Sequence, residues 1–407
     1  MYTPEVILIL IGTIVFLGFI GRLIFEKTKI PEVVWLMILG VFIGYYEAVT
    51  TDMMLSIAPV FAAIALAIIL FEGGLNMDFY KVLKQFPRSS SLAILNLIFS
   101  IIFVSMISVL IFSLLGIQGW TWLHGILLGA IVGGSSSAIV IPIVQDLKIR
   151  KDIITMLSLE SAVTDALCVV SAIAVLQLIV ATTQGGAGIE ASLFAHNILS
   201  AFSIGAVIGI ACGIGWLYVS RAIKKVPSTH RLDLAVVFMI YGFVELVAGS
   251  GAISALFFGI VLGNGDAIAK IIRTRKKLEI SNETIAFQSE VTFFVRTFFF
   301  VFLGMLVGVD DSKMLIIGIF LGVILVAARV VPTYISSYNT DITQDEQRFI
   351  LMMAPRGLAA AVLAQLPIFY NIPNAEIFSD LVFVIILVSI LITIIGIFVT
   401  SQKISEC

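Results

Sequence analysis

The sequence predicts an all-α protein that crosses the membrane many times, and three observations support this fold class. The chain has 407 residues, of which 60% are hydrophobic and only 12% are charged, about half the charged share of a typical soluble domain. Apolar runs near the ~20 residues that cross a bilayer recur along the whole length. Lys and Arg residues gather in alternate loops between these runs, as expected of a multi-pass protein. No basic segment precedes the first run, so we expect a retained helix and not a cleaved signal peptide.

Each apolar run is assigned one transmembrane helix, which gives about thirteen helices in a single domain over residues 1–407. The first half covers 1–219 and the second half covers 231–407, with a basic cytoplasmic linker at 267–286 between the ninth and tenth helices. The helices are expected at residues 5–24, 31–46, 55–74, 89–115, 122–144, 153–181, 197–219, 231–248, 252–265, 287–309, 314–333, 348–366 and 378–400.

The distribution of positive charge predicts the orientation of these helices. Of the 24 Lys and Arg residues, only Lys313 falls on one side of the membrane, while Arg296 and Arg356 are left inside it. All the others fall on the opposite side, including Arg329, which is assigned to the loop end of the eleventh helix. Because positive charge is retained on the cytoplasmic side, we expect a cell-membrane protein with its N-terminus outside and its C-terminus in the cytoplasm.

Two pairs of similar motifs indicate an internal repeat. One pair shares Gly-x-x-x-Gly near the end of a short helix, and the other shares Phe-x-Gly-x-Leu at the end of the following helix. An offset of seven spans inverts the second copy, which is the arrangement of many secondary transporters. The alternative is that these small residues only form helix-packing faces. The motifs are "LMILGVFIG" (36–44) and "LFFGIVLG" (256–263), then "LFEGGLNMD" (70–78) and "VFLGMLVGVD" (301–310).

The fifth and twelfth helices are both predicted to be discontinuous. The fifth contains "VGGSSSAIVIP" (132–142) and the twelfth contains "MAPRGLAAAV" (353–362), so each places strong helix breakers inside an apolar run. A proline kink with a structural purpose alone is the alternative. Irregular backbone at membrane depth is tolerated only where it is buried in protein or lines a cavity. We therefore predict two crossing, interrupted helices beside a binding site.

The sixth helix places two acids in the apolar stretch "LSLESAVTDALCVV" (157–170). Glu160 and Asp165 lie about 140° apart around a helix, so they should have separate roles. A buried carboxylate needs a partner or takes up a proton. We expect Glu160 to pair with Arg356, and Asp165 to hold either a proton or a monovalent cation. The alternative for Asp165 is a structural ion pair with Arg296.

Hydroxyl groups near Asp165 suit a hard monovalent cation. Ser161 lies one helical turn before Asp165 on the same face, while Thr164 shares the neighbouring face with Glu160. Ser135, carbonyls of the broken fifth helix and water could complete the set of ligands.

The chain resembles the monovalent cation:proton antiporter superfamily, and in particular the NhaP-type sodium/proton exchangers related to the animal NHE exchangers. The resemblance implies a homodimer in which a six-helix core moves by an elevator mechanism. It also implies that Asp165 carries the ion and the proton, that Glu160 pairs with Arg356, and that Ser161 and Ser135 coordinate the ion. The matching segments are "KIPEVVWLMILGVFIG" (29–44), "LFEGGLNMD", "LESAVTD" (159–165), "RTFFFVFLG" (296–304) and "APRGLAAAV" (354–362).

Two departures from the family pattern bear on the ion. Thr164 stands where electroneutral members often have Asn and electrogenic members have Asp, which leaves one carboxylate and favours exchange of one proton for one cation. The triplet Ser135-Ser136-Ser137 replaces the usual Thr-Asp-Pro and is similar to the potassium-efflux branch. We therefore count Thr164 and Ser136 among the ion ligands and Arg296 as a supporting residue.

The predicted function is antiport of Na⁺ or Li⁺ against H⁺, with K⁺/H⁺ antiport and, less favoured, a cation channel as alternatives. An intramembrane hydrolase is disfavoured, because no membrane histidine or lysine is placed to activate a serine. The sequence shows no phosphate loop, metal cluster or basic nucleic-acid patch. The expected partners are therefore the ions, the lipid bilayer and a second copy of the chain, with no cofactor.

Overall fold

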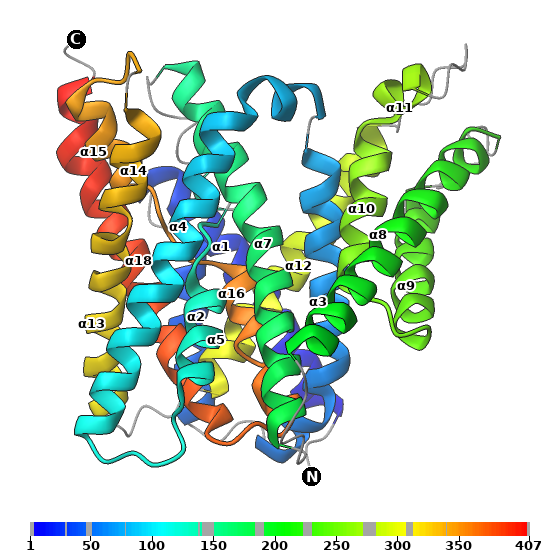
Figure 1. The fold of residues 1–407 in the computed structure, drawn as a ribbon. Helices are drawn as coiled ribbons and strands as arrows, with labels where there is room; N and C mark the ends of the chain where they lie inside the picture. The colour runs from blue at the N-terminus through cyan, green and yellow to red at the C-terminus, as the bar shows by residue number, and fades with distance from the viewer. Residues whose placement is uncertain are drawn as a thin grey trace. The chain divides into compact units, whose positions relative to one another are not determined.

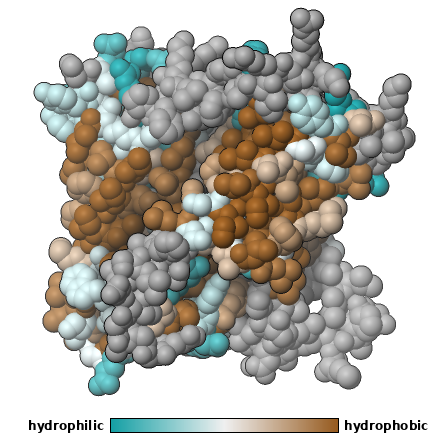
Figure 2. Space-filling model, turned by 45° about the vertical axis from the view of Figure 1, so that its right-hand side comes forward, coloured by the Kyte–Doolittle hydropathy of each residue, from teal (hydrophilic) through white to brown (hydrophobic). Residues whose placement is uncertain are grey.

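The computed structural model of the chain is all-helical in the residues that it describes, which confirms the predicted fold class (Figure 1). Six helices within this part are long and apolar enough to cross a membrane. Many large apolar side chains remain exposed, among them Phe16, Ile102 and Ile395, and Figure 2 shows such residues over much of the face in view. The described residues are 4–28, 31–45, 51–77, 79–136, 139–140, 150–183, 191–222, 230–271, 282–306, 312–338 and 340–404.

Two compact units make up the chain. The first unit comprises residues 1–59, 88–179 and 296–407, and the second comprises 60–87 and 180–295. The first unit holds all or most of α1 (Pro4–Thr28), α2 (Glu32–Tyr45), α4 (Phe79–Leu114), α5 (Trp122–Val132), α7 (Lys151–Thr183), α13 (Ser312–Ala328), α14 (Val330–Ser337), α15 (Gln344–Met352), α16 (Leu358–Leu363), α17 (Leu366–Phe369) and α18 (Ala375–Ile404). The second holds most of α3 (Thr51–Asn76), with α8 (Ala191–Ala222), α9 (His230–Leu246), α10 (Gly251–Gly263) and α11 (Gly265–Ile271). Helix α12 (Asn282–Leu306) begins in the second unit and ends in the first.

Both predicted helix interruptions are present. Helix α5 ends at Val132, the chain is non-helical at 133–136, and helix resumes at 139–140. Helix α15 ends at Met352 and α16 begins at Leu358, and the backbone between them is not helical. Ser137 and Pro142, which also contribute to the predicted break, lie outside the described residues. The predicted linker at 267–286 begins inside α11 and ends inside α12, and its residues 272–281 also lie outside this part of the chain.

Helix α4 supports α5 along three glycines spaced four residues apart. A Cβ atom added at Gly129 would lie 2.6 Å from the Cα atom of Ile101, and one added at Gly125 would lie 2.8 Å from the Cα atom of Ser105. The third glycine, Gly133, meets the Leu97 side chain. Because only hydrogen occupies these positions, the two backbones approach closely, as small residues permit between membrane helices. This contact fixes α5 up to the residue where it stops.

In the first unit, α2 and α12 cross at a pair of glycines. A Cβ atom at Gly40 would collide with the Val301 carbonyl oxygen, and one at Gly304 would collide with the Met37 carbonyl oxygen. The Cα atom of Gly304 would lie 2.8 Å from the Cβ atom added at Gly40. The Gly-x-x-x-Gly motif at 36–44 therefore forms a close helix contact.

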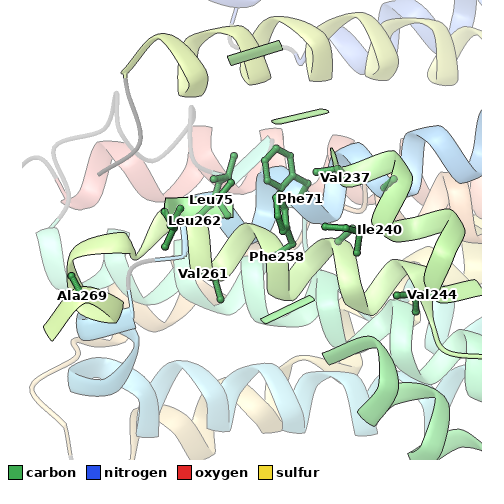
Figure 3. Close-up of a cluster of buried hydrophobic side chains, with 12 residues drawn as sticks. Phe71, Leu75, Val237, Ile240, Val244, Phe258, Val261, Leu262 and Ala269 are labelled. Atoms are coloured by element: carbon green, nitrogen blue, oxygen red, sulfur yellow. The ribbon is translucent and has the colours of Figure 1, made fainter. Parts of the chain in front are cut away.

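In the second unit, α3 and α10 cross in an equivalent way. A Cβ atom at Gly74 would collide with the Leu256 carbonyl oxygen, and one at Gly259 would collide with the Phe71 carbonyl oxygen. Around this crossing a core of apolar side chains gathers from α3, α9 and α10, with the rings of Phe71 and Phe258 at 5.6 Å between centroids (Figure 3).

The two crossings correspond residue by residue, which supports the predicted repeat. Gly40 and Gly259 are equivalent, and each contacts the copy of the Phe-x-Gly-x-Leu motif from the other half of the chain. The counterpart of Gly304 in the first copy of the repeat is Gly74. The shared Phe-x-Gly-x-Leu pattern had instead aligned Gly304 with Gly73. Gly73 has nothing within 4 Å of an added Cβ atom. The motif alignment was therefore wrong by one residue in α3, because pattern matching cannot tell which of two adjacent glycines faces the partner helix.

Candidate functional site

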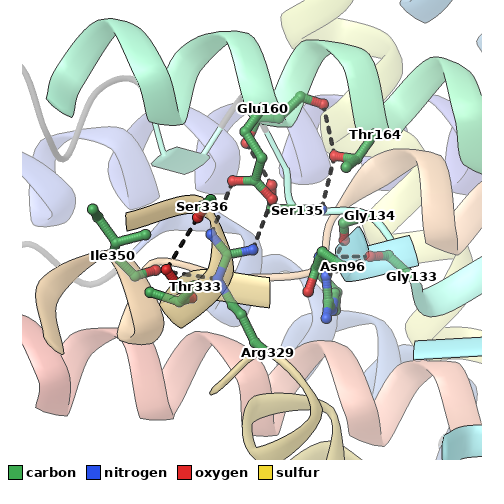
Figure 4. Close-up of polar contacts among 12 residues, drawn as sticks. Asn96, Gly133, Gly134, Ser135, Glu160, Thr164, Arg329, Thr333, Ser336 and Ile350 are labelled. Atoms are coloured by element: carbon green, nitrogen blue, oxygen red, sulfur yellow. Dashed lines mark hydrogen bonds and ion pairs between the residues drawn. The ribbon is translucent and has the colours of Figure 1, made fainter. Parts of the chain in front are cut away.

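Three buried hydroxyl groups meet where α5 is interrupted. The Ser135 hydroxyl lies 2.8 Å from the Ser161 hydroxyl of α7, and both side chains are fully buried. The Ser135 amide donates a hydrogen bond to Thr164 Oγ1 at 3.2 Å, and that hydroxyl in turn donates to the Ser161 carbonyl at 3.0 Å. Figure 4 shows Ser135 and Thr164 on the facing segments. The structure therefore brings together three of the predicted ion ligands and joins the broken helix to α7.

Asp165 follows Thr164 on α7 and is half-buried. Its side chain lies one helical turn after Ser161, so the carboxylate and the hydroxyl share a face of the helix. Gly134 lies over the next turn of the same helix, because a Cβ atom added there would lie 2.9 Å from the Cys168 sulfur. The interrupted part of α5 thus covers α7 on both sides of Asp165 along the helix.

Glu160 pairs with Arg329, which corrects the prediction that it pairs with Arg356. The Arg329 nitrogens Nη1 and Nη2 lie 2.7 Å and 2.9 Å from the two carboxylate oxygens of Glu160, a bidentate pair (Figure 4). Both side chains have no exposed surface. The Arg329 Nε also donates to the Ile350 carbonyl at 3.1 Å, which connects the pair to α15. Arg329 is therefore a buried structural cation.

The misplacement of Arg329 has a local cause. The eleventh helix was expected to end at residue 333, which put Arg329 beside a loop. In the structure the helical segment continues through α14 to Ser337, and Arg329 lies between α13 and α14. The apolar residues on both sides of it, "LVAARVVP", are the signal that could have placed this arginine inside the membrane.

Arg356 covers the end of α5. Its Nη1 donates to the carbonyls of Gly133 and Gly134, at 3.2 Å and 2.5 Å. The side chain is 1% exposed. A cation beside the last carbonyls of a helix opposes their partial negative charge, so Arg356 stabilises the interrupted end of α5. Asn96 of α4 donates to the same Gly133 carbonyl at 3.0 Å.

The two interrupted segments contact each other directly. The Ser136 amide donates to the Pro355 carbonyl at 2.7 Å, and the Ser136 side chain occupies the space that a side chain at Gly357 would need. Arg356 is held from the other side, because its amide donates to the Ser389 hydroxyl of α18 at 2.9 Å. Ser136 was predicted as an ion ligand, and the structure places it at the crossing of the two segments.

Arg296 pairs with Glu32 and so connects α12 with α2. The alternative interpretation, in which Arg296 is the partner of Asp165, is therefore not supported. Sequence reasoning missed Glu32, because it lies at the start of the second expected helix and resembles an interfacial residue. It also missed Asn96, since a polar side chain on a packing face carries no distinctive pattern.

A polar cluster at one end of α7 lies outside the apolar segments. Arg150 contacts Asp152 at 3.0 Å and Glu346 at 3.5 Å, and its Nη1 donates to the Asp341 carbonyl. These contacts raise the pKa of the exposed Arg150, chiefly through the hydrogen bond to Asp152. They connect the start of α7 with the start of α15 on one side of the bundle.

The contacts of the charged groups show which of them are already paired and which could bind an ion. Glu160 and Arg329 neutralise each other, and Arg356 is directed at backbone carbonyls. Asp165 adds a carboxylate beside neutral oxygen donors. A carboxylate with neutral oxygens suits a hard cation of low charge, and the same carboxylate can bind a proton.

Comparisons with known proteins identify the family of the chain. A family profile described as "Sodium/hydrogen exchanger, transmembrane" matches residues 12–403. The K(+)/H(+) antiporter NhaP of Alkalimonas amylolytica is 24% identical over 395 residues, which are 94% of this chain and 64% of that protein. The K(+)/H(+) antiporter NhaP2 of Shewanella oneidensis is 26% identical over 81% of this chain and 54% of its own length. The chain thus spans about 54–64% of the length of these two relatives.

Two further comparisons involve proteins of similar length to this chain. The Probable Na(+)/H(+) antiporter 2 of Methanocaldococcus jannaschii is 26% identical over 86% of this chain and 84% of that protein. The solved structure of the sodium proton antiporter MjNhaP1 from the same organism superposes with a TM-score of 0.75. That superposition covers 98% of both chains at 19% identity and shows that the fold is shared.

Proposed function

Because the chain belongs to the sodium/hydrogen exchanger family, we propose that it exchanges a monovalent cation for protons at Asp165. The observation that supports this site best is the cluster of buried hydroxyls from Ser135, Ser161 and Thr164 at the interrupted helix beside Asp165. Glu160 is paired with Arg329, which leaves Asp165 as the acid of α7 proposed to alternate between proton and cation.

Exchange at a single carboxylate is electroneutral. One proton and one monovalent cation carry the same charge, so the site has the same net charge in either loaded form. Thr164 adds no second carboxylate, and its hydroxyl is engaged with the Ser135 amide and the Ser161 carbonyl. We therefore propose a stoichiometry of one proton for one cation.

Na⁺ or Li⁺ is proposed as the cation, and K⁺ is the second candidate. Sodium is supported by the family profile, described as a sodium/hydrogen exchanger, and by the Methanocaldococcus relative, which is named a probable Na(+)/H(+) antiporter. The second candidate is supported by the names of the Alkalimonas and Shewanella relatives, which are K(+)/H(+) antiporters. The serine triplet beginning at Ser135 also favours it.

Transport is proposed to follow an elevator mechanism in a homodimer within the cell membrane, as the family resemblance implies. With Arg329 buried in an ion pair, the cytoplasmic side still receives twenty of the 24 Lys and Arg residues. This distribution supports an outside N-terminus, a cytoplasmic C-terminus and a cytoplasmic segment between α11 and α12.

The test is cation-driven dissipation of a pH gradient in vesicles that contain the purified protein, with the membrane potential clamped. Na⁺, Li⁺ and K⁺ are added separately, and Asp165→Asn is the matched control. If only Na⁺ and Li⁺ dissipate the pH gradient, the sodium assignment is supported. If K⁺ dissipates it equally fast or faster, the potassium assignment is supported. Cation flux without proton movement, retained in Asp165→Asn, would replace the antiporter by a channel.

A further inference from the structure

Asn96 of α4 has no part in the exchange described above, yet it contacts the interrupted helix. Its side chain is fully buried, and its Nδ2 donates to the Gly133 carbonyl at 3.0 Å (Figure 4). In the described part of the chain its Oδ1 has no hydrogen-bond partner. The donor end of the amide is therefore the end that the fold uses.

This contact helps to end α5. In a continuous helix the Gly133 carbonyl would accept from the amide four residues later. Here it accepts from Asn96 and from Arg356 Nη1, at 3.0 Å and 3.2 Å. The two side chains take the place of that amide, so the carbonyl stays satisfied although the helix has stopped.

Asn96 is also supported rigidly. It precedes Leu97, whose side chain meets Gly133 at the last of the three close contacts between α4 and α5. A short side chain on a buried face of α4, which is packed closely against α5 at Gly125 and Gly129, has little freedom to move. The Gly133 carbonyl is thus held from a fixed surface.

We propose that Asn96 is a positioning residue for the transported cation. By holding Gly133 it sets the path of the chain into Ser135, two residues later, and so fixes the Ser135 hydroxyl at its 2.8 Å contact with Ser161. The inference rests on the proposed function, because it assigns those hydroxyls to the ion. It adds α4 as a third element that determines cation affinity and selectivity.

The first test compares Asn96→Leu with Ser100→Ala in the vesicle assay. Ser100 lies one turn later on the same helix, is fully buried, and its hydroxyl has no partner among the described residues, so it is the matched control. Loss of one hydrogen bond predicts a rise of about three- to tenfold in the apparent KM for Na⁺ in Asn96→Leu. The ratio of the KM values for Na⁺ and K⁺ should also change, while the maximal rate stays within about twofold. Ser100→Ala should match the parent in all three.

The second test uses Asn96→Asp, which keeps the shape of the side chain. Only a protonated carboxyl can donate to the Gly133 carbonyl, whereas the ionised form repels it and attracts Arg356. The KM of this variant relative to the parent, measured at each pH, should therefore be near one at low pH and rise as the pH increases. A residue that only fills space would give a constant ratio.

Two results would overturn the proposal. One is an unchanged KM and an unchanged Na⁺/K⁺ ratio in Asn96→Leu, together with a pH-independent ratio for Asn96→Asp. The other is loss of folded protein in both variants while Ser100→Ala folds, which would limit Asn96 to folding. Failure of the proposed function is distinct, since the parent protein itself would then show no cation-driven proton movement.

Discussion

Removal of the Glu160 carboxylate should destabilise the protein strongly, and removal of Arg329 as well should restore most of the loss. In Glu160→Met the Arg329 guanidinium stays buried and, among the residues that the structure describes, keeps only its hydrogen bond to the Ile350 carbonyl. Loss of one partner from a buried ion pair costs about 3–5 kcal/mol, because a desolvated charge remains uncompensated.

The double variant Glu160→Met/Arg329→Met removes both charges. Replacement of a buried pair by apolar side chains of similar size is often close to neutral, so its free energy of unfolding should lie within about 1 kcal/mol of the parent. The double-mutant cycle should therefore give a coupling energy of about 3 kcal/mol between the two residues.

The assay is unfolding in mixed micelles of dodecyl maltoside and SDS, followed by far-ultraviolet circular dichroism. Glu160→Met/Arg356→Met serves as the control, because Arg356 donates to the Gly133 and Gly134 carbonyls and not to Glu160. The Glu160–Arg329 pairing would be refuted if the stability lost in Glu160→Met were restored by Arg356→Met and not by Arg329→Met. A loss of less than about 1 kcal/mol in the free energy of unfolding of Glu160→Met would also refute it.

Three other substitutions have defined outcomes. Gly74→Ala should lower the free energy of unfolding by about 1–3 kcal/mol, because its Cβ atom would collide with α10. Gly73→Ala has open space around it and should be neutral or slightly stabilising. Equal effects of the two variants on unfolding in mixed micelles would contradict the crossing of α3 and α10. Thr164→Asn should change the Na⁺/K⁺ ratio of apparent KM values by disturbing the contact with the Ser135 amide, and an identical ratio in vesicles would argue against a role in selectivity. Arg356→Met should reduce the exchange rate by about tenfold or more, since hydrogen bonds from a charged donor contribute about 1.5–3 kcal/mol. Arg356→Lys should retain part of the activity. Full exchange activity of Arg356→Met in vesicles would show that the arginine is not needed at the site.

The interrupted helices could be predicted because their cause is local. Gly133-Gly134 and Pro355-Arg356-Gly357 weaken helical backbone wherever they occur, so an apolar run that contains them reveals a break. The hydroxyls on α7 could be placed for a similar reason, since the helical period puts Ser161 and Asp165 on one face.

The ion pairs could not be predicted from these patterns. The sequence left Arg296 and Arg356 inside the membrane as possible partners of Glu160, whereas its partner in the structure is Arg329, which was assigned to a loop. That pairing depends on the continuation of the helix into α14 and on the path of α15. Arg356 is directed at carbonyls that exist only because α5 stops. Such partners follow from tertiary structure, and only the presence of uncompensated charge could be read from the sequence.

The number of protons released on cation binding tests the role of Asp165 most directly. Purified protein is titrated with NaCl in weakly buffered detergent solution, and the change in pH is measured together with the heat of binding, with KCl as a parallel titration. We expect about one proton released per cation bound at a pH where Asp165 is protonated, and neither heat nor proton release in Asp165→Asn. Cation binding without proton release, or binding and release that persist in Asp165→Asn, would contradict the exchange of cation and proton on this carboxylate.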